Sequence, residues 1–204
     1  PTSLALVRGF ARRSASDVGN FWVDVTRSVL YVLLPICLVI ALVLVWRGVP
    51  QNLDAYTQAQ TITGQVQTIA QGPVASQEAI KQLGTNGGGF FNANASHPFE
   101  NPTPFTNLIA MLLIFVLPAG LVYAFGKWVG NTKQGWALLN VMSLLFTAGV
   151  GITMVAEQHG NPLLTSAGAS QATEIDGLSA PGGNMEGKET RFGISASSLF
   201  AVVT

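Results

Sequence analysis

The stretch SVLYVLLPICLVIALVLVW (Ser28–Trp46) sets the fold class of this chain, because none of its residues carries a formal charge. As an α-helix, a segment of this length extends about 28 Å, close to the thickness of the hydrocarbon core of a bilayer. The whole chain is 49% hydrophobic and only 10% charged, whereas soluble domains carry about 25% charged residues. The alternative, apolar helices buried in a large soluble core, leaves too little charge to cover the outside of that core. The sequence therefore predicts an integral membrane protein.

Two further uncharged windows lie at Asn107–Phe125 and Trp136–Ala156. Aromatic side chains, which favour the membrane–water interface, stand at or near the ends of the three windows: Trp46, Tyr123, Trp128 and Trp136. A proline lies inside each of the first two windows, where neighbouring helices can satisfy the carbonyl that proline leaves without a partner. We expect an all-α fold with transmembrane helices over residues 28–46, 107–125 and 136–156.

The distribution of basic residues predicts which segments face the cytoplasm. Residues 1–27 hold four arginines against two aspartates, and residues 126–135 hold two lysines and no acid. The long segments that follow the first and third windows carry more acidic than basic residues. By the positive-inside rule, 1–27 is a cytoplasmic segment and 126–135 a cytoplasmic loop, while 47–75 and 157–193 are outer loops. Because arginines and apolar residues mix in 1–27, we expect an interfacial helix there, with a simple polar lead-in as the alternative.

Between the first two windows, residues 76–106 read SQEAIKQLGTNGGGFFNANASHPFENPTPFT. Ser76 can cap a short helix that ends at Leu83, with Glu78 favourably placed in its first turn. A glycine run follows at once, and three prolines then forbid a continuous helix: Pro98, Pro102 and Pro104. A helix too short to cross a bilayer, followed by an irregular strand and a return, is typical of a re-entrant pore helix and filter loop, since irregular backbone at membrane depth must line a cavity.

The glycine run suits the chemistry of a cation filter. Such a filter replaces the water around an alkali cation with backbone carbonyl oxygens, and glycine permits the backbone angles that point successive carbonyls at one axis. No Asp or Glu lies within Gly84–Phe91, so the loop favours a monovalent ion held by dipoles. The alternative is a flexible glycine-rich linker, although linkers lack the flanking apolar helix and the pair Phe90 and Phe91, which can wedge the loop against its surroundings.

Two segments around this loop, LGTNGGGFFNA (Leu83–Ala93) and HPFENPTPFTN (His97–Asn107), carry a specific resemblance. They resemble the second filter loop of KdpA, the potassium-binding, channel-like component of bacterial Kdp potassium-transporting ATPases. The resemblance continues through GNFWVDVTRSVLYVLLP (Gly19–Pro35), GPVASQEAIKQ (Gly72–Gln82) and GKETRFGI (Gly187–Ile194), and so covers nearly the whole chain. It implies a helix–pore loop–helix repeat of the potassium-channel-like superfamily, with four such repeats around one pore.

The resemblance also implies the site residues. The carbonyls that would bind dehydrated potassium belong to Thr85, Asn86, Gly87 and Gly88, with Gly87 at the centre, while Gly89 lets the chain turn away and Phe90 and Phe91 support the filter. Potassium is then the transported ligand of this non-catalytic subunit. The resemblance further implies a partner P-type ATPase subunit that hydrolyses ATP, small accessory membrane subunits that complete the complex, and a protein that spans the bacterial plasma (inner) membrane several times.

The chain has no initiator Met and ends in the apolar run ISASSLFAVVT (Ile194–Thr204). We therefore expect a fragment of a longer protein, which contains the second repeat and, at residues 194–204, the start of the next pore helix. Glu100 lies in the segment that follows the glycine-rich loop. It either attracts cations to the mouth of the pore or bonds to other groups within the loop, and we favour the second role. Two other functions stay open: a stand-alone channel-like potassium transporter without an ATPase partner, and a membrane scaffold without a pore.

Several other activities are disfavoured by the sequence. Residues 182–189 nearly match a phosphate-binding P-loop, but Glu189 replaces the Ser or Thr that would bind magnesium. The chain also lacks the sequence Asp-Lys-Thr-Gly, the phosphorylation site of P-type pumps, so we expect no nucleotide to be bound by this chain. A net charge of +0 argues against a nucleic-acid partner. Cys37, His97 and His159 are too widely spaced for a metal site, so potassium is the only metal ion expected.

Overall fold

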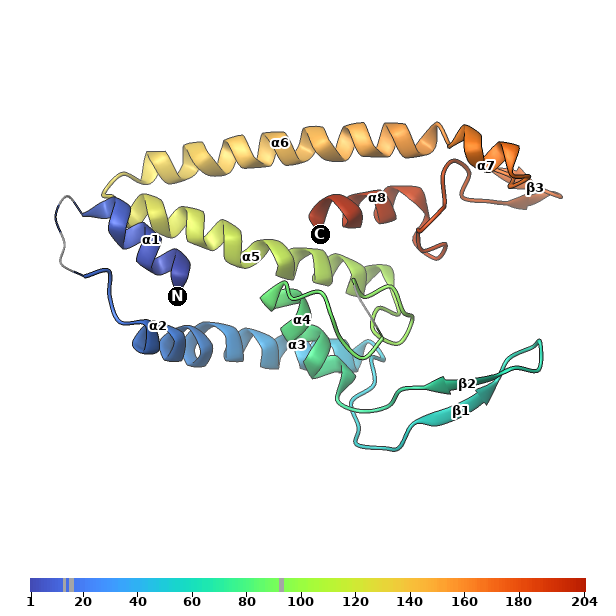
Figure 1. Ribbon diagram of the computed structural model, residues 1–204, viewed down its shortest axis with the longest axis horizontal. Coiled ribbons are helices and arrows are strands. Elements are labelled where there is room, and N and C mark those ends of the chain that lie inside the picture. The colour runs from blue at the N-terminus through green and yellow to red at the C-terminus, as the bar shows by residue number, and fades with distance from the viewer. Residues whose placement is uncertain (13, 15–16, 92–93) are drawn as a thin grey trace. The chain divides into compact units, whose positions relative to one another are not determined.

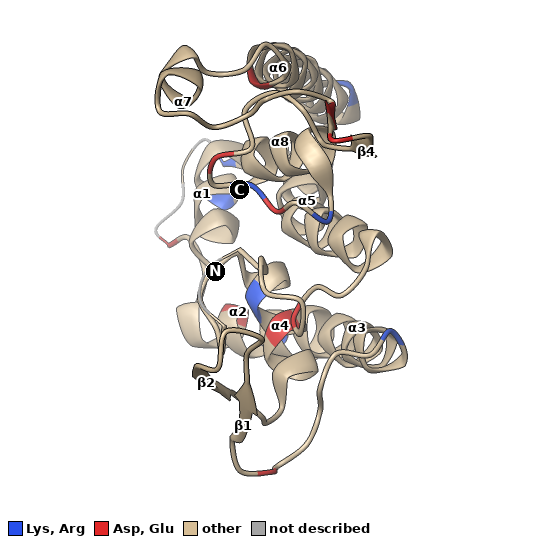
Figure 2. Cartoon of the chain, turned by 90° about the vertical axis from the view of Figure 1, so that its right-hand side faces the viewer, with Lys and Arg blue, Asp and Glu red and all other residues tan. Residues whose placement is uncertain are grey.

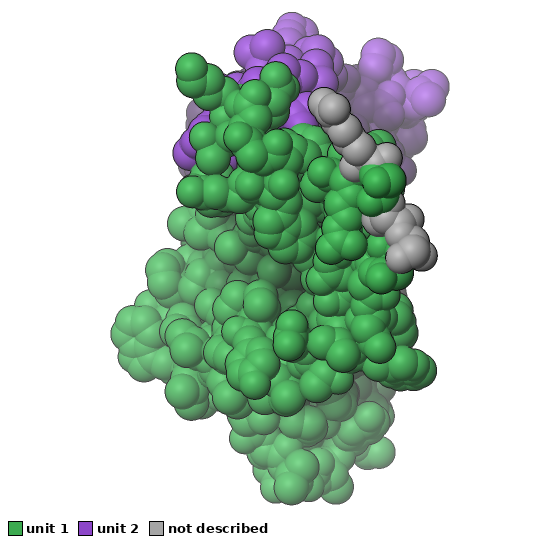
Figure 3. Space-filling view, turned by 90° about the vertical axis from the view of Figure 1, so that its left-hand side faces the viewer, with its two compact units in different colours: residues 1–135 green, residues 136–204 purple. Residues whose placement is uncertain are grey.

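The computed structural model describes residues 1–12, 14, 17–91 and 94–204 as a mostly helical chain with two short β-hairpins (Figure 1). The chain divides into two compact units, Pro1–Gly135 and Trp136–Thr204, which Figure 3 distinguishes by colour. The expected all-α fold is therefore only partly correct: the described residues are mostly helical but also form two short hairpins.

The first long helix runs without a break through α2 (Phe21–Ser28), the π-helical turn η1 (Val29–Leu33) and α3 (Leu34–Trp46). The π turn directly precedes Pro35, whose ring nitrogen carries no hydrogen and removes one α-helical hydrogen bond. The backbone adapts by donating from the Leu34 N–H to the Val29 carbonyl, five residues back. Such a wide turn is a common response to a local break in the α-helical ladder.

This helix begins seven residues before the predicted window because Asn20 caps it. The Asn20 side chain accepts a hydrogen bond from the Val23 N–H at 3.2 Å, which satisfies one of the free donors of the first turn. Residues 1–27 therefore contain a separate helix, α1 (Thr2–Ala11), followed by the beginning of the first long helix. Arg8 of α1 forms a two-pronged ion pair with the buried Asp24, with Nη2 at 2.8 Å from Oδ1, so this contact ties α1 to the beginning of the first long helix.

A polar hairpin follows the first long helix. Strands β1 (Thr57–Gln60) and β2 (Val66–Ile69) pair antiparallel, with Thr57 opposite Ile69. The turn closes through a 2.9 Å hydrogen bond from the Thr61 N–H to the Gln65 carbonyl, and Gly64 adopts a φ of +84° that favours glycine.

The short helix α4 (Val74–Gly84) packs between α3 and the long helix α5 (Pro104–Trp128) (Figure 1). The buried apolar side chains at this contact come from α3, α4 and the chain between: Leu44, Val49, Val74, Ala75 and Ala79. Helix α5 begins with a capping box, in which the Thr103 hydroxyl and the Thr106 side chain each accept the other residue's backbone N–H. These contacts hold both ends of the intervening loop.

The second unit contains most of α6 (Thr132–Gln158), α7 (Pro162–Ser166), the small hairpin of β3 (Glu174–Ile175) and β4 (Leu178–Ser179), and α8 (Gly193–Val203). Glu157, near the end of α6, anchors the segment before α8. Its carboxylate accepts a 2.7 Å hydrogen bond from Asn184 Nδ2 and lies 2.9 Å from Lys188 Nζ.

Three helices of the described residues are long and apolar enough to cross a membrane: Phe21–Trp46, Pro104–Trp128 and Thr132–Ser166. The second contains the window predicted at 107–125, and the third contains the window at 136–156. Figure 2 shows that the long helices carry few charged residues, whereas α4 carries charges of both signs. The chain has the character of a membrane protein, as its composition predicts.

The backbones of α5 and α6 approach closely near the turn that joins them. A Cβ on Gly126 would lie 2.9 Å from the Gly135 Cα atom, and backbone atoms cannot move aside as a flexible side chain can. We expect Gly126→Ala to lower the free energy of unfolding by about 1–3 kcal/mol through overpacking. Gly120→Ala is the matched control, since nothing lies within 4 Å of its Cβ position and alanine favours helix by about 1 kcal/mol. Thermal unfolding of the complete protein distinguishes them, and equal midpoints would contradict the close contact.

Candidate functional site

The glycine-rich loop begins at a left-handed residue that is not glycine. Thr85 has φ 53° and ψ 29°, which terminates α4 in a Schellman motif: the Asn86 N–H donates to the Lys81 carbonyl and the Thr85 N–H to the Gln82 carbonyl, both at 3.3 Å. A β-branched residue rarely takes this conformation, and holding one there costs about 1–3 kcal/mol. Strain of this kind is concentrated at functional sites.

Two of the predicted ligand carbonyls accept hydrogen bonds from this chain. The Gly87 carbonyl accepts the Asn94 N–H at 3.1 Å, and the Gly88 carbonyl accepts Gln77 Nε2 at 3.0 Å. Each carbonyl oxygen has a second lone pair, so both bonds orient the oxygens and leave each able to accept another ligand. Gly87 has a φ of +76° with space around its Cβ position. Its backbone angle, rather than crowding, is therefore what requires glycine there.

The loop lies open on one side and packed on the other. Residues 84–90 are exposed or half-buried in this chain, while the Gln77 side chain fills the space where a Cβ on Gly89 would stand. Gln77 thus contacts both Gly88 and Gly89 from α4. The sequence did not single out this glutamine, because its partner is a backbone atom eleven residues away along the chain.

The two phenylalanines differ in their surroundings. Phe91 packs against the apolar cluster around Leu44 and stacks on His97, with ring centroids 4.2 Å apart and planes 16° apart. The ring of Phe90 lies over Gly72, about 3.2 Å from where a Cβ would be. His97 accepts the Phe99 N–H through Nδ1 at 3.2 Å, so it orders the return segment, and no group of three His, Cys, Asp or Glu that could hold a metal ion is found in the described chain.

A charged cluster lies buried beside the loop. Lys81 is 0% exposed, and its Nζ lies 2.6 Å from Glu78 Oε2 and 2.8 Å from Glu100 Oε1. Gln82 Nε2 donates to Glu78 Oε1 at 2.7 Å. Glu100 therefore bridges within the loop, which confirms the favoured expectation for this residue. Because Lys81 precedes the loop and Glu100 follows it, this ion pair fixes the separation of the two ends of the loop.

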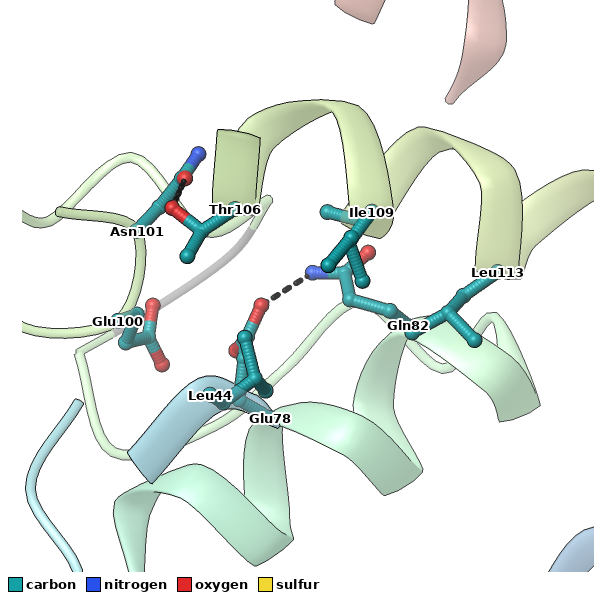
Figure 4. Close-up of a pocket in the computed structure, with 9 residues that line it drawn as sticks. Leu44, Glu78, Gln82, Glu100, Asn101, Thr106, Ile109 and Leu113 are labelled. Atoms are coloured by element: carbon teal, nitrogen blue, oxygen red, sulfur yellow. Dashed lines mark hydrogen bonds between the residues drawn. The ribbon is translucent and has the colours of Figure 1, made fainter. Parts of the chain in front are cut away.

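A second set of polar side chains continues the cluster to the start of α5. Thr106 Oγ1 donates to Asn101 Oδ1 at 2.6 Å, and Asn101 Nδ2 donates to Asn107 Oδ1 at 2.8 Å. These groups are also buried. Asn101 and Thr106 line a cavity of about 10 Å³ together with Glu78, Gln82 and Glu100 (Figure 4). This is the space that one water molecule needs.

The helix that carries this cluster starts earlier than predicted. It begins at Val74 after Pro73, and Ser76 does not cap it, since its hydroxyl donates to the Pro73 carbonyl at 3.0 Å. Glu78 therefore lies beyond the first turn, where it meets Lys81 instead of the free backbone donors. The expectation of a Ser76 cap with Glu78 in the first turn is wrong, because the cap lies three residues earlier, at Pro73, and Val74 and Ala75 are buried in the first turn of the helix.

The arrangement is that of a helical membrane protein in which a short helix and a glycine-rich loop lie between two helices long and apolar enough to cross a membrane. Residues 2–204 match the family described as the potassium-transporting ATPase A subunit. The chain belongs to this family.

Individual relatives agree with that match. The chain is 60% identical over 202 residues to the potassium-transporting ATPase potassium-binding subunit of Solibacter usitatus, covering 99% of this chain and 34% of the relative. It is 59% identical to the proteins of the same name from Methylobacterium radiotolerans and Bradyrhizobium diazoefficiens, with the same coverage. The chain spans about a third of the length of these curated relatives.

Proposed function

We propose that this chain forms part of the potassium-binding and translocating subunit of an ATP-driven potassium uptake pump. The observation that carries the proposal is the glycine-rich loop, held at both ends by the Lys81–Glu100 ion pair and open on the side away from α4. Thr85, Asn86, Gly87 and Gly88 offer backbone carbonyls to dehydrated potassium, and Gly89 lets the chain turn away. The relatives are named as parts of a potassium-transporting ATPase, which favours the pump over a stand-alone transporter.

The proposed mechanism is substitution of a hydration shell by oriented dipoles. Carbonyl oxygens stand in for the water that potassium loses on entry, and a loop whose geometry is fixed in advance needs little rearrangement to accept the ion. Gln77 on one side, and Phe90 and Phe91 on the other, hold that geometry. A single loop supplies only part of a coordination shell, so the remaining oxygens come from corresponding repeats of the complete protein.

We also propose the assembly that this role requires. A P-type ATPase catalytic subunit hydrolyses ATP, small accessory membrane subunits complete the complex, and the chain described here is non-catalytic and binds no nucleotide. It crosses the bacterial inner membrane several times in helix–pore loop–helix repeats, with residues 1–27 and 126–135 in the cytoplasm. Residues 76–106 form the re-entrant segment of one repeat, and 194–204 begin the pore helix of the next.

A pair of density maps tests this proposal directly. Cryo-electron microscopy of the complete complex in potassium and in sodium is expected to show an ion beside the carbonyls of Thr85–Gly88 in potassium only. The sodium sample is the control for water, which both samples contain. A loop without potassium-dependent density, or with the same density in both salts, would contradict the proposal.

A further inference from the structure

The charged groups beside the loop do not balance. Glu78, Lys81 and Glu100 are 2%, 0% and 1% exposed, and two carboxylates against one ammonium leave an excess negative charge. Removing such a charge from water is costly unless it is paired, and a buried group in this position takes up a proton instead. Because like charges that share a site do not ionise together, one proton neutralises the set.

The other charged and titratable groups on the surrounding elements are occupied elsewhere. In the described chain, the Arg47 guanidinium lies 5.0 Å from the Phe105 ring and the Lys127 ammonium 5.7 Å from the Tyr123 ring. His97 stacks on Phe91, and Cys37 of α3 packs on the apolar cluster around Leu44. Lys81 is therefore the cation that both carboxyl groups of the cluster contact.

Two buried carboxyl oxygens of the cluster have no hydrogen-bond partner within the described residues, Glu78 Oε2 and Glu100 Oε2, but Glu78 Oε2 lies 2.6 Å from Lys81 Nζ. Within the described residues, Glu100 Oε2 is buried and accepts or donates no hydrogen bond, whereas Oε1 of the same group faces Lys81. Glu100 also lines the cavity of about 10 Å³ between α4 and α5 (Figure 4). An unpartnered carboxyl oxygen beside a space of that size is the arrangement that an internal water molecule satisfies.

We propose that Glu78, Lys81 and Glu100 form a binding site for one proton, which the two carboxyl groups share at neutral pH, and that one water molecule in the adjoining cavity hydrogen-bonds to Glu100 Oε2. Burial raises the pKa of Glu78 above its ordinary value, and the hydrogen bond with Lys81 opposes the rise. The site goes beyond the proposed function and does not depend on potassium binding.

The sign of the pH dependence follows. A carboxyl group whose pKa is higher in the folded than in the unfolded protein contributes stability that is fully present below its unfolded pKa. That stability is lost as the pH rises through the raised pKa, because the released proton leaves two carboxylates facing one ammonium. High pH therefore weakens the tie between α4 and the return segment that carries Glu100.

Infrared spectroscopy of the complete protein in lipid nanodiscs tests the proton directly. The stretching band of a protonated carboxyl group is expected in the wild type at neutral pH, shifted in heavy water, and lost as the pH is raised into the alkaline range. Glu78→Gln and Glu100→Gln are each expected to abolish that same band, since the remaining carboxylate then balances Lys81 without a proton. Glu157→Gln, which alters the carboxylate paired with Lys188, is the control that keeps it.

The outcomes separate clearly. Absence of the band at neutral pH in the wild type, its persistence in both glutamine variants, or its loss in the control would each overturn the shared proton. Should the variants fail to fold, the wild type still decides: its thermal midpoint must fall over the pH range in which the band disappears. Density for one water beside Glu100 Oε2 in an experimental map supports the second part, and an empty cavity overturns it. None of these measurements requires potassium, so they stand apart from the ion-density test.

Discussion

Gly87→Asp is expected to reduce the preference of the complete complex for potassium over sodium by about tenfold or more, equivalent to about 1.4 kcal/mol of differential binding. Gly87 has a φ of +76°, so any Cβ strains the backbone whose carbonyl is the central ligand of the proposed filter. The carboxylate adds a formal charge to a loop that holds none, which favours the smaller, more strongly attracted sodium ion. Ion competition in an uptake or ATPase assay measures the ratio.

Gly64→Asp is the matched control for this change. Gly64 has a similar φ of +84°, with nothing within 4 Å of its Cβ position, but it lies in the turn of the β1–β2 hairpin. It therefore experiences the same chemical change and comparable backbone strain away from the glycine-rich loop. We expect its ion preference to match the wild type. Unaltered selectivity in Gly87→Asp, with the protein folded, would remove Gly87 from the proposed filter.

Lys81→Met is expected to be the most destabilising single change in the first unit, with a loss of about 3–5 kcal/mol in the free energy of unfolding. Methionine has a similar length and fills the volume, so packing is largely kept. The loss comes from Glu78 and Glu100, which would remain buried without the ammonium that lies 2.6 and 2.8 Å from them. Chemical or thermal unfolding of the complete protein measures the effect.

Two further variants isolate the electrostatic cause. Lys188→Met removes an ammonium 2.9 Å from Glu157, but those side chains are 11% and 25% exposed, so a loss of about 1 kcal/mol or less is expected. The triple variant Lys81→Met, Glu78→Gln, Glu100→Gln removes the stranded charges and should recover much of the lost stability. If the triple variant is no more stable than Lys81→Met alone, lost packing rather than charge explains the effect.

The long helices and the order of the loop could be predicted from the sequence because both depend on local patterns. Uncharged windows of membrane-crossing length need no knowledge of the rest of the fold. The glycine run between a short helix and three prolines likewise predicts its own irregular backbone. The start of the first long helix was harder to predict from the sequence, because its cap, Asn20, lies in a segment whose charges favour a separate interfacial helix.

The buried cluster could not be predicted in the same way. Glu78 and Lys81 at a spacing of three resemble an ordinary exposed pair on a helix, and the second carboxylate of the cluster, Glu100, comes from a segment nineteen residues further on. The left-handed conformation of Thr85 could not be predicted either, because β-branched residues rarely adopt it. The cluster depends on a contact between segments nineteen residues apart, and the conformation of Thr85 opposes the preference of its residue type, so propensity and periodicity predict neither feature.

The π turn at Val29–Leu33 also changes which way the first long helix faces. A wide turn accommodates one additional residue and so shifts the angular phase of the helix by about 100°. In an unbroken α-helix, Asp24 and Leu44 would point to nearly opposite sides; the shift moves Asp24 toward the side on which Leu44 packs. Pro35, which interrupts the α-helical hydrogen bonds, thus allows one continuous helix to direct Asp24 and Leu44 to neighbouring sides. Asp24 there meets Arg8, and Leu44 meets the apolar cluster.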